Sequence, residues 1–237
     1  MGRVNTAFKE RLAAGEPTVL MNADHPSSGL VAALGGIGID AIMIDAEQGN
    51  PSLSDAEEMR RAARSVGLSA LVRVPTALPW MIERWLSRDL DGVVVPRLDT
   101  AAQAAQAIRD IEYCLPNDAD DATIVVQIES VSAVEELDGF LALDRVDAYF
   151  IGAVDLAKSM GLRGAYRTPE AWSLIESVVD RIAGAGRRAG MIVTEADVAH
   201  WVDRGATLLY GHVNELLRIG ARSWRSTAGI DAPHEDR

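Results

Sequence analysis

The sequence predicts a single (βα)8 barrel, and three observations lead to this fold class. The chain has 237 residues, 48% of them apolar, which is enough for one large core. Short apolar and β-branched runs recur along it, at residues 18–21, 41–44, 69–72, 92–95, 123–128, 148–151, 190–193 and 207–210. Segments with helical spacing separate these runs, which predicts parallel strands covered on both faces. This pattern fits a closed barrel better than an open doubly wound sheet, which is the alternative fold.

The segments between the runs have the periodicity of helices that bury one face. Residues 169–183, for example, place Trp172, Ile175, Val179 and Ile182 on the same face. No linker divides the chain, so residues 1–226 are predicted to form one barrel domain with a C-terminal helix. Residues 227–237 are predicted to form a flexible tail.

A glycine cluster, Gly35, Gly36 and Gly38, lies just before the second predicted strand. A dinucleotide-binding loop follows a strand and has the spacing GxGxxG, whereas this cluster does neither. We therefore expect it to end a helix. The sequence also lacks the GxxxxGK[ST], HExxH, CxxC and GxSxG motifs, so several common chemistries have no support here.

Charge and composition exclude several classes of partner. The formal net charge is −12 with no basic run, so nucleic acid and anionic membrane surfaces are not expected to bind. No apolar segment reaches the roughly 20 residues that a membrane helix needs, and residues 1–10 do not resemble a signal peptide. Cys114 is the only cysteine, which excludes an internal disulfide. We expect a cytoplasmic protein.

Charged residues follow several of the predicted strands at the end where barrel enzymes carry their active sites. Arg73 ends the third strand, Glu129 follows the fifth, and Asp155 comes shortly after the sixth. Each also has a structural interpretation, as a rim ion pair, the start of a helix and a helix N-cap respectively. Asp45, after the second strand, is expected to cap the turn that leaves that strand.

Two carboxylates and an arginine at one mouth indicate a site for a hard cation and a 2-oxo acid. Glu129 and Asp155 are the predicted ligands of a divalent metal ion, Mg²⁺, Mn²⁺ or Co²⁺, since oxygen ligands do not select among these ions. Arg73 is expected to stabilise the negative charge of a metal-bound enolate. Free N–H groups of the turn after the sixth strand are expected to hold the substrate carboxylate, and this turn consists of Gly152, Ala153, Val154 and Asp155.

Six stretches carry a resemblance to a known family. They read GIDAIMIDAE at 38–47, VRVP at 72–75, GVVVP at 92–96, VQIE at 126–129, FIGAVDL at 150–156 and SMG at 159–161. In this order they resemble the class II, metal-dependent pyruvate aldolases of the HpcH/HpaI family. The resemblance implies that Glu129 and Asp155 bind the metal, that Arg73 stabilises the pyruvate enolate, and that Glu47 belongs to the metal's water shell. It also implies a homo-oligomer, a trimer or hexamer, in which the last helices, including residues 213–224, contact a neighbour.

The chain departs from the family pattern in two places. The family's acid–base histidine is replaced by Gln48, and the aspartate that holds this histidine aligns with Ser87. Glutamine cannot take a proton near neutral pH, so an ordinary aldolase mechanism would lose about 10² to 10⁴ in rate. Gln48 and Ser87 could still hydrogen-bond each other or a substrate. The family's longer segment between the fourth and fifth strands is also missing, which predicts a pocket that is more open there, or one that a neighbouring subunit or another loop closes.

Three functions therefore remain open at this stage. The first is an aldol or retro-aldol lyase in which another group, such as His25 or His212, is the base. The second is a decarboxylase, or a decarboxylative bond-forming enzyme, because loss of CO₂ from an oxaloacetate-like substrate gives the enolate without a base. The third is a non-catalytic binding homologue. Arg163 and Arg167 are either solvated loop residues or contacts for a second substrate carboxylate.

Overall fold

The computed structural model describes residues 4–230 and confirms the predicted barrel. Within this part of the chain, eight parallel strands form one closed sheet in sequence order, because β1 pairs with β8. The open doubly wound sheet is thereby excluded. The strands are β1 (Thr18–Asn22), β2 (Ala41–Asp45), β3 (Ser69–Arg73), β4 (Gly92–Val95), β5 (Thr123–Ile128), β6 (Ala148–Ile151), β7 (Ala189–Ile192) and β8 (Ala206–His212). The predicted strands agree with these bounds to within one or two residues.

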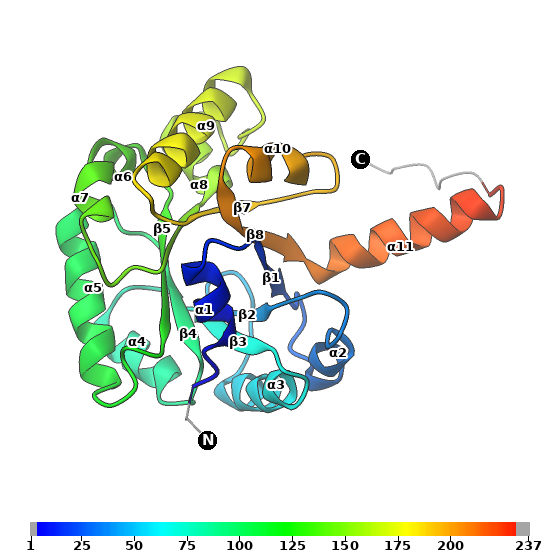
Figure 1. Ribbon diagram of the computed structural model, residues 1–237, viewed down its shortest axis with the longest axis horizontal. Coiled ribbons are helices and arrows are strands. Elements are labelled where there is room, and N and C mark those ends of the chain that lie inside the picture. The colour runs from blue at the N-terminus through cyan, green and yellow to red at the C-terminus, as the bar shows by residue number, and fades with distance from the viewer. Residues whose placement is uncertain (1–3, 231–237) are drawn as a thin grey trace.

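Helices surround the sheet (Figure 1). Those described within residues 4–230 are α1 (Ala7–Ala13), α2 (Ser28–Ala33), α3 (Leu53–Ser65), α4 (Pro79–Leu86), α5 (Ala101–Cys114), α6 (Val131–Glu135), α7 (Leu137–Leu141), α8 (Ala153–Ser159), α9 (Pro169–Gly184), α10 (Val198–Asp203) and α11 (Val213–Thr227). Local sequence explains where several begin: Ser52 starts α3 and Thr100 starts α5 with reciprocal capping hydrogen bonds. On α9, the predicted core positions Ile175, Val179 and Ile182 are buried.

The barrel is filled from inside and closed at one end by α1. Its interior cluster contains Leu20, Met43, Leu71, Val94, Val125, Ala148, Phe150, Leu208 and Tyr210, together with Phe8 and Leu12 of α1. Lys9 Nζ donates to the carbonyls of Asp120 and Ala122, just before β5, and Arg188, just before β7, donates to the carbonyl of Leu12. Because these contacts lie where strands begin, α1 covers the N-terminal end and leaves the C-terminal end as the mouth (Figure 1).

Helix α11 differs from the other helices because it extends away from the barrel (Figure 1). Leu217 is 61% exposed and Trp224 is 81% exposed, while Val213 is its buried residue. The helix continues to Thr227, one residue into the predicted tail, and the part of that tail at 231–237 lies outside the described residues.

Two further sequence predictions concern segments outside the strands. Gly36 and Gly38 have φ angles of 76° and 90° and follow α2 directly, so the glycine cluster ends a helix as predicted. Within residues 4–230, no helix is both long and apolar enough to cross a bilayer.

Replacing Phe8 by Ala tests the role of α1 as the closure of the barrel. Phe8 is 1% exposed and packs among the interior side chains, so its truncation should lower the free energy of unfolding by about 3–5 kcal/mol. Urea denaturation measures this change. The control is Tyr113→Ala on α5, where the side chain is 83% exposed and the loss should be within about 0.5 kcal/mol. Equal losses for the two variants would contradict the proposed role of α1.

Candidate active site

An ion pair between neighbouring strands fixes Arg73 at the mouth of the barrel. The register of the sheet places Asp45 opposite Arg73 at the ends of β2 and β3. Arg73 Nε donates to Asp45 Oδ1 at 3.0 Å, and Nη2 donates to Asp45 Oδ2 at 2.6 Å. Both side chains are largely buried, with 14% of Arg73 and 8% of Asp45 exposed. This bidentate geometry holds the guanidinium in one orientation.

Asp45 also caps the turn after β2, as the sequence predicted. Its Oδ1 accepts the backbone N–H groups of Glu47 and Gln48, both at 3.1 Å. Burial alone would raise the pKa of the Asp45 carboxyl, but these hydrogen bonds and the Arg73 guanidinium outweigh burial and lower it. Burial would likewise lower the pKa of Arg73, but the hydrogen bonds and charge of Asp45 raise it. The pair is therefore fully ionised near neutral pH.

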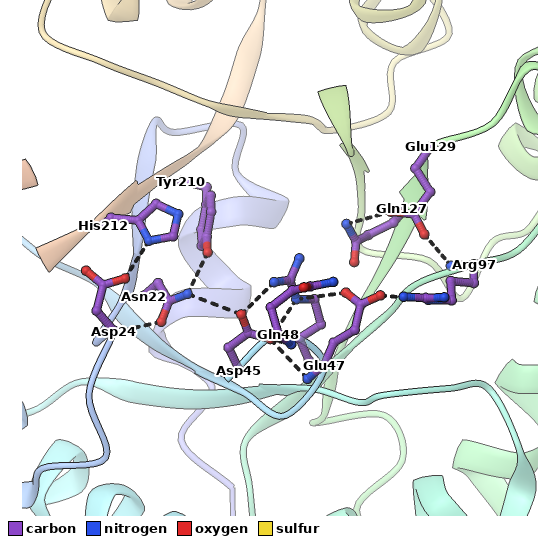
Figure 2. A network of polar contacts seen from close by, with 11 residues as sticks. Asn22, Asp24, Asp45, Glu47, Gln48, Arg97, Gln127, Glu129, Tyr210 and His212 are labelled. Atoms are coloured by element: carbon purple, nitrogen blue, oxygen red, sulfur yellow. Dashed lines mark hydrogen bonds and ion pairs between the residues drawn. The ribbon is translucent and has the colours of Figure 1, made fainter. Parts of the chain in front are cut away.

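Glu47 bridges two arginines. Its side chain is only 3% exposed, and its Oε2 lies 3.3 Å from Arg73 Nε. Its Oε1 accepts from Arg97 Nε at 2.8 Å (Figure 2). Arg97 follows β4 and Pro96, with a backbone φ of 60° that non-glycine residues rarely adopt. Arg97 was not predicted as a site residue, although its place just beyond a strand end was a signal for it.

Glu129 follows β5 and is held from both sides. It is 7% exposed, its Oε1 accepts the backbone N–H of Arg97 at 2.5 Å, and its Oε2 accepts from Gln127 Nε2 at 3.1 Å (Figure 2). Gly152 lies directly beside it, since a Cβ atom there would be 2.6 Å from Glu129 Cβ and 2.7 Å from Oε2. Only glycine therefore fits at this place. The Gln127 amide oxygen is buried and has no hydrogen-bond partner among the described residues.

The environment of Glu129 favours its protonated form. Burial raises the pKa of the Glu129 carboxyl to about 7, and the negative charges of Glu47 and Asp155 add to the rise. The backbone N–H of Arg97 opposes the rise without cancelling it. Ionised Glu129 would add a buried negative charge near those of Glu47 and Asp155, and a bound cation would stabilise it.

Asp155 lies in the first turn of α8, which follows β6, and β6 pairs with β5, the strand that precedes Glu129. Its side chain is 44% exposed, and Lys158 Nζ lies 2.8 Å from Oδ1. Within residues 4–230, no three His, Cys, Asp or Glu side chains are grouped as a complete metal site. Glu129 and Asp155 could therefore contribute two carboxylates, with water and substrate completing the shell, and oxygen donors of this kind suit Mg²⁺ or Mn²⁺. The unsatisfied Gln127 oxygen adds a further acceptor near this place.

The turn predicted to hold a substrate carboxylate is only partly available for that role. The Gly152 N–H donates to the Ile128 carbonyl at 3.0 Å, so the structure does not leave this donor for a substrate. Ala153, Val154 and Asp155 form the first turn of α8, and no side chain caps it. First-turn N–H groups have no partner within their own helix, so these three can still donate to an anion.

Gln48 and Ser87 are not brought together within the chain. Gln48 is exposed at the mouth, after β2. Ser87 is the C-cap of α4, where its Oγ donates to the Arg84 carbonyl at 3.1 Å. Because α4 runs from the mouth back to the start of β4, Ser87 lies at the opposite end of its own barrel.

A cavity of about 210 Å³ lies beside the Asp45–Arg73 pair, between the ends of β1, β2 and β8. Its lining includes Asn22, Asp24, His25, Asp45, Gln48 and His212. Asn22 Nδ2 donates to the Tyr210 hydroxyl at 2.9 Å, and both residues are buried. Burial raises the pKa of Tyr210, so it is neutral near pH 7. Asn22, Asp24 and Tyr210 were not predicted as site residues, because they meet only when the first and last strands pair.

The remaining candidate side chains differ in how the structure uses them. His25 Nε2 lies 3.3 Å from Asn214 Oδ1, and His212 Nδ1 lies 2.6 Å from Asp24 Oδ1 (Figure 2). Arg167 Nη2 donates to Asp197 Oδ2 at 2.7 Å, and its guanidinium lies over the rings of Tyr166 and Trp172. Arg167 is therefore held by other protein groups, and Arg163, in the same loop, has a positive φ of 53°.

Comparisons with known proteins agree with this fold. The chain is 29% identical over 226 residues to a hydroxypyruvate/pyruvate aldolase of Agrobacterium fabrum, covering 85% of each protein. It is 26% identical over 215 residues to a 2-keto-3-deoxy-L-rhamnonate aldolase of Escherichia coli, covering 81% of this chain and 80% of that protein. A crystal structure of an HpcH/HpaI aldolase/citrate lyase family protein from Burkholderia cenocepacia superimposes with a TM-score of 0.83 at 24% identity, covering 94% of this chain and 99% of that one.

The family model described as HpcH/HpaI aldolase/citrate lyase matches residues 21–213. This match spans the barrel from β1 to the start of α11 and includes Arg73, Glu129 and Asp155. It covers well over half of the chain, and the chain therefore belongs to the HpcH/HpaI aldolase/citrate lyase family.

Proposed function

We propose that this protein is a metal-dependent carbon–carbon lyase of the aldol type that acts on a small 2-oxo acid through a pyruvate enolate. One observation carries the proposal: Arg73 is held ionised by Asp45 at the same mouth where Glu129 is buried with a raised pKa. The fixed guanidinium can stabilise a substrate oxygen that becomes negatively charged, and the carboxylates beside it could hold a divalent cation that stabilises the same charge. The family and the aldolase names of the relatives support the lyase class.

Glu129 and Asp155 are the residues that would hold the divalent cation. When bound, the cation supplies positive charge to the carboxylate and keto oxygens of the 2-oxo acid. Glu129 has to release its proton before it can ligate, and Arg97 and Gln127 orient its two oxygens through their N–H groups. Mg²⁺, Mn²⁺ and Co²⁺ all suit this donor set.

Arg73 provides the fixed positive charge for the reaction. Its Nε and Nη2 are occupied by Asp45, so Nη1 is the nitrogen best placed to donate to the oxygen that becomes negative. The N–H groups of Ala153 and Val154 are proposed to bind the substrate carboxylate at the first turn of α8. Glu47, between Arg73 and Arg97, is proposed to accept from water at the mouth.

A decarboxylase is the second candidate function, and Gln48 is the observation that favours it. Gln48 lines the cavity beside Arg73 but cannot accept a proton near neutral pH. Decarboxylation of an oxaloacetate-like acid forms the enolate without a base. A homologue that only binds the acid is the third candidate.

Activity with three substrates distinguishes these functions. The Mn²⁺-loaded protein is incubated with oxaloacetate, with pyruvate plus glycolaldehyde, and with pyruvate in D₂O. We expect aldol product and exchange of the pyruvate methyl protons, both followed by NMR. Arg73→Lys should lower the turnover number by about 10²-fold, because an ammonium cannot keep the bidentate geometry to Asp45.

The control for this experiment is Arg109→Lys, on the exposed surface of α5, which should leave turnover unchanged. Oxaloacetate consumption without exchange or aldol product would favour the decarboxylase instead. A protein that is inactive in all three assays but binds oxalate, a stable analogue of the enolate, would be the binding homologue.

Metal binding should compete with the proton on Glu129. A carboxyl with a raised pKa keeps its proton in the folded state between pH 4.5 and about 7, whereas the unfolded chain has released it. The free energy of unfolding of the metal-free protein should therefore fall as pH rises through this window, by up to on the order of 3 kcal/mol. Urea denaturation at pH 5, 6, 7 and 8 measures the fall.

Glu129→Gln provides the matched comparison, since glutamine has a similar shape and does not titrate. This variant should lack the Glu129 share of the pH dependence and should be more stable than the metal-free wild type at pH 8. Added Mn²⁺ should stabilise the wild type more at pH 8 than at pH 6, and should stabilise the variant little at either pH. Identical pH profiles for the two proteins would refute the assignment of this proton to Glu129.

We also propose that the protein is a homo-oligomer, a trimer or hexamer, assembled through α11. An apolar groove of about 230 Å³ runs between α11 and the outer face of β1 and β8, and its lining includes Val19, Met21, Val198, Leu209, Leu216 and Ile219. The apolar side chains of Leu217 and Trp224 also remain exposed on the projecting helix. A second copy of the chain would cover these surfaces.

Charge placed on α11 should dissociate this oligomer. The double substitution Leu217→Glu and Trp224→Glu should reduce the mass measured by light scattering to that of one 25.4 kDa chain. Tyr113→Glu, on the exposed face of α5, is the control and should leave the mass unchanged. A wild-type protein that is already monomeric at micromolar concentration would refute the proposal.

A further inference from the structure

A histidine and an aspartate form a fixed pair on the wall of the cavity that Asp45 also lines. His212 ends β8 and Asp24 follows β1, and these strands pair so that Asn22 lies opposite His212. His212 Nδ1 lies 2.6 Å from Asp24 Oδ1. Asp45 and Gln48 also line this cavity.

Several contacts fix Asp24 in this position. Its Oδ2 accepts the backbone N–H of Asn214 at 2.7 Å, and its own N–H donates to Asn22 Oδ1 at 2.9 Å. Its side chain is 11% exposed, and its φ of 58° is a conformation that non-glycine residues rarely adopt. Asp24 is therefore held with one carboxylate oxygen directed at the His212 ring.

This geometry sets the tautomer of His212. A carboxylate oxygen at 2.6 Å accepts a hydrogen bond, which places the imidazole proton on Nδ1 and leaves a lone pair on Nε2. The His212 side chain is 39% exposed, and Nε2 lies on the side of the ring away from Asp24 (Figure 2). A histidine with this tautomer can take up and return a proton.

The pair is connected to the proposed enolate site through buried polar groups. Asn22 accepts from Asp24 and donates to the hydroxyl of Tyr210, whose ring lies 5.1 Å from that of His212 in an edge-on arrangement. Asn22 Nδ2 also lies 3.5 Å from Asp45 Oδ2, the oxygen that accepts from Arg73 Nη2. The cavity of about 210 Å³ is large enough for a small aldehyde, and Asp45 in its wall pairs with Arg73.

We propose that His212 is the proton-transfer residue for the electrophile half of the reaction, with Asp24 as its positioning residue and the cavity as the aldehyde subsite. This proposal rests on the proposed aldol function. In the cleavage direction, Nε2 takes the proton of the C4 hydroxyl of a 4-hydroxy-2-oxo acid while the C3–C4 bond breaks. The electron pair of that bond forms the enolate, and the C4 carbon leaves as an aldehyde. The imidazolium then gives its proton to C3, which yields pyruvate and neutral His212.

Pyruvate methyl exchange in D₂O tests the proposal with His212→Gln and Asp24→Asn. We expect His212→Gln to lower exchange by about 10² to 10⁴-fold and Asp24→Asn by at least about 10-fold. Oxalate affinity in the presence of Mn²⁺ should stay within about threefold of the wild type, because Arg73, Glu129 and Asp155 are unchanged. In His212→Gly, added imidazole should restore part of the exchange, which a purely structural role would not allow.

The control is His200→Gln, since His200 Nε2 also contacts a carboxylate, Glu176 Oε1 at 2.9 Å, but on the outer helices. This variant should exchange as the wild type does. Exchange that persists at the wild-type rate in His212→Gln overturns the inference and leaves the proposed function intact. Loss of oxalate binding in that variant, or failure of imidazole to rescue His212→Gly, also overturns it. A wild type that neither binds oxalate nor exchanges would instead refute the proposed function.

Discussion

The bidentate ion pair between Asp45 and Arg73 is the interaction on which the rest of the site depends. The parallel register of β2 and β3 sets the two residues opposite each other, so the pair follows from the barrel itself. A buried guanidinium without this partner would be strongly destabilising, since breaking such a pair costs about 3–5 kcal/mol. With Asp45 in place, the guanidinium can stay protonated at a largely buried position and donate from Nη1 to a substrate.

The other charges at the mouth are arranged around this pair and are not balanced. Asp45 neutralises Arg73, and Arg97 contacts Glu47 while donating its backbone N–H to Glu129. The Glu129 carboxyl is left with a raised pKa because burial and its neighbours disfavour another negative charge. A proton or a cation can relieve this imbalance, and the choice between them connects pH, metal binding and stability in one equilibrium.

The sequence was sufficient for the barrel and for the charges at strand ends, but not for groups that meet across the barrel. Apolar runs located the strands because parallel strands are buried on both faces, and Arg73 and Glu129 were found because they stand where strands end. Arg97 acts partly through a backbone N–H in an unusual conformation, which residue type does not predict. Asp24 and His212 are 188 residues apart, and only the closing register of β1 with β8 brings them together.

The proposed proton transfer depends on a different part of the molecule from the one that holds Arg73. Arg73 depends on β2 and β3, whereas Asp24 also accepts the N–H of Asn214 in the first turn of α11. That helix projects from the barrel with apolar side chains exposed. If a second copy covers α11, assembly would add to the contacts that already hold the first turn of this helix and the Asp24 carboxylate. Proton transfer would then depend on the oligomer more strongly than binding of the 2-oxo acid does, because only the former shares a hydrogen bond with the interface helix.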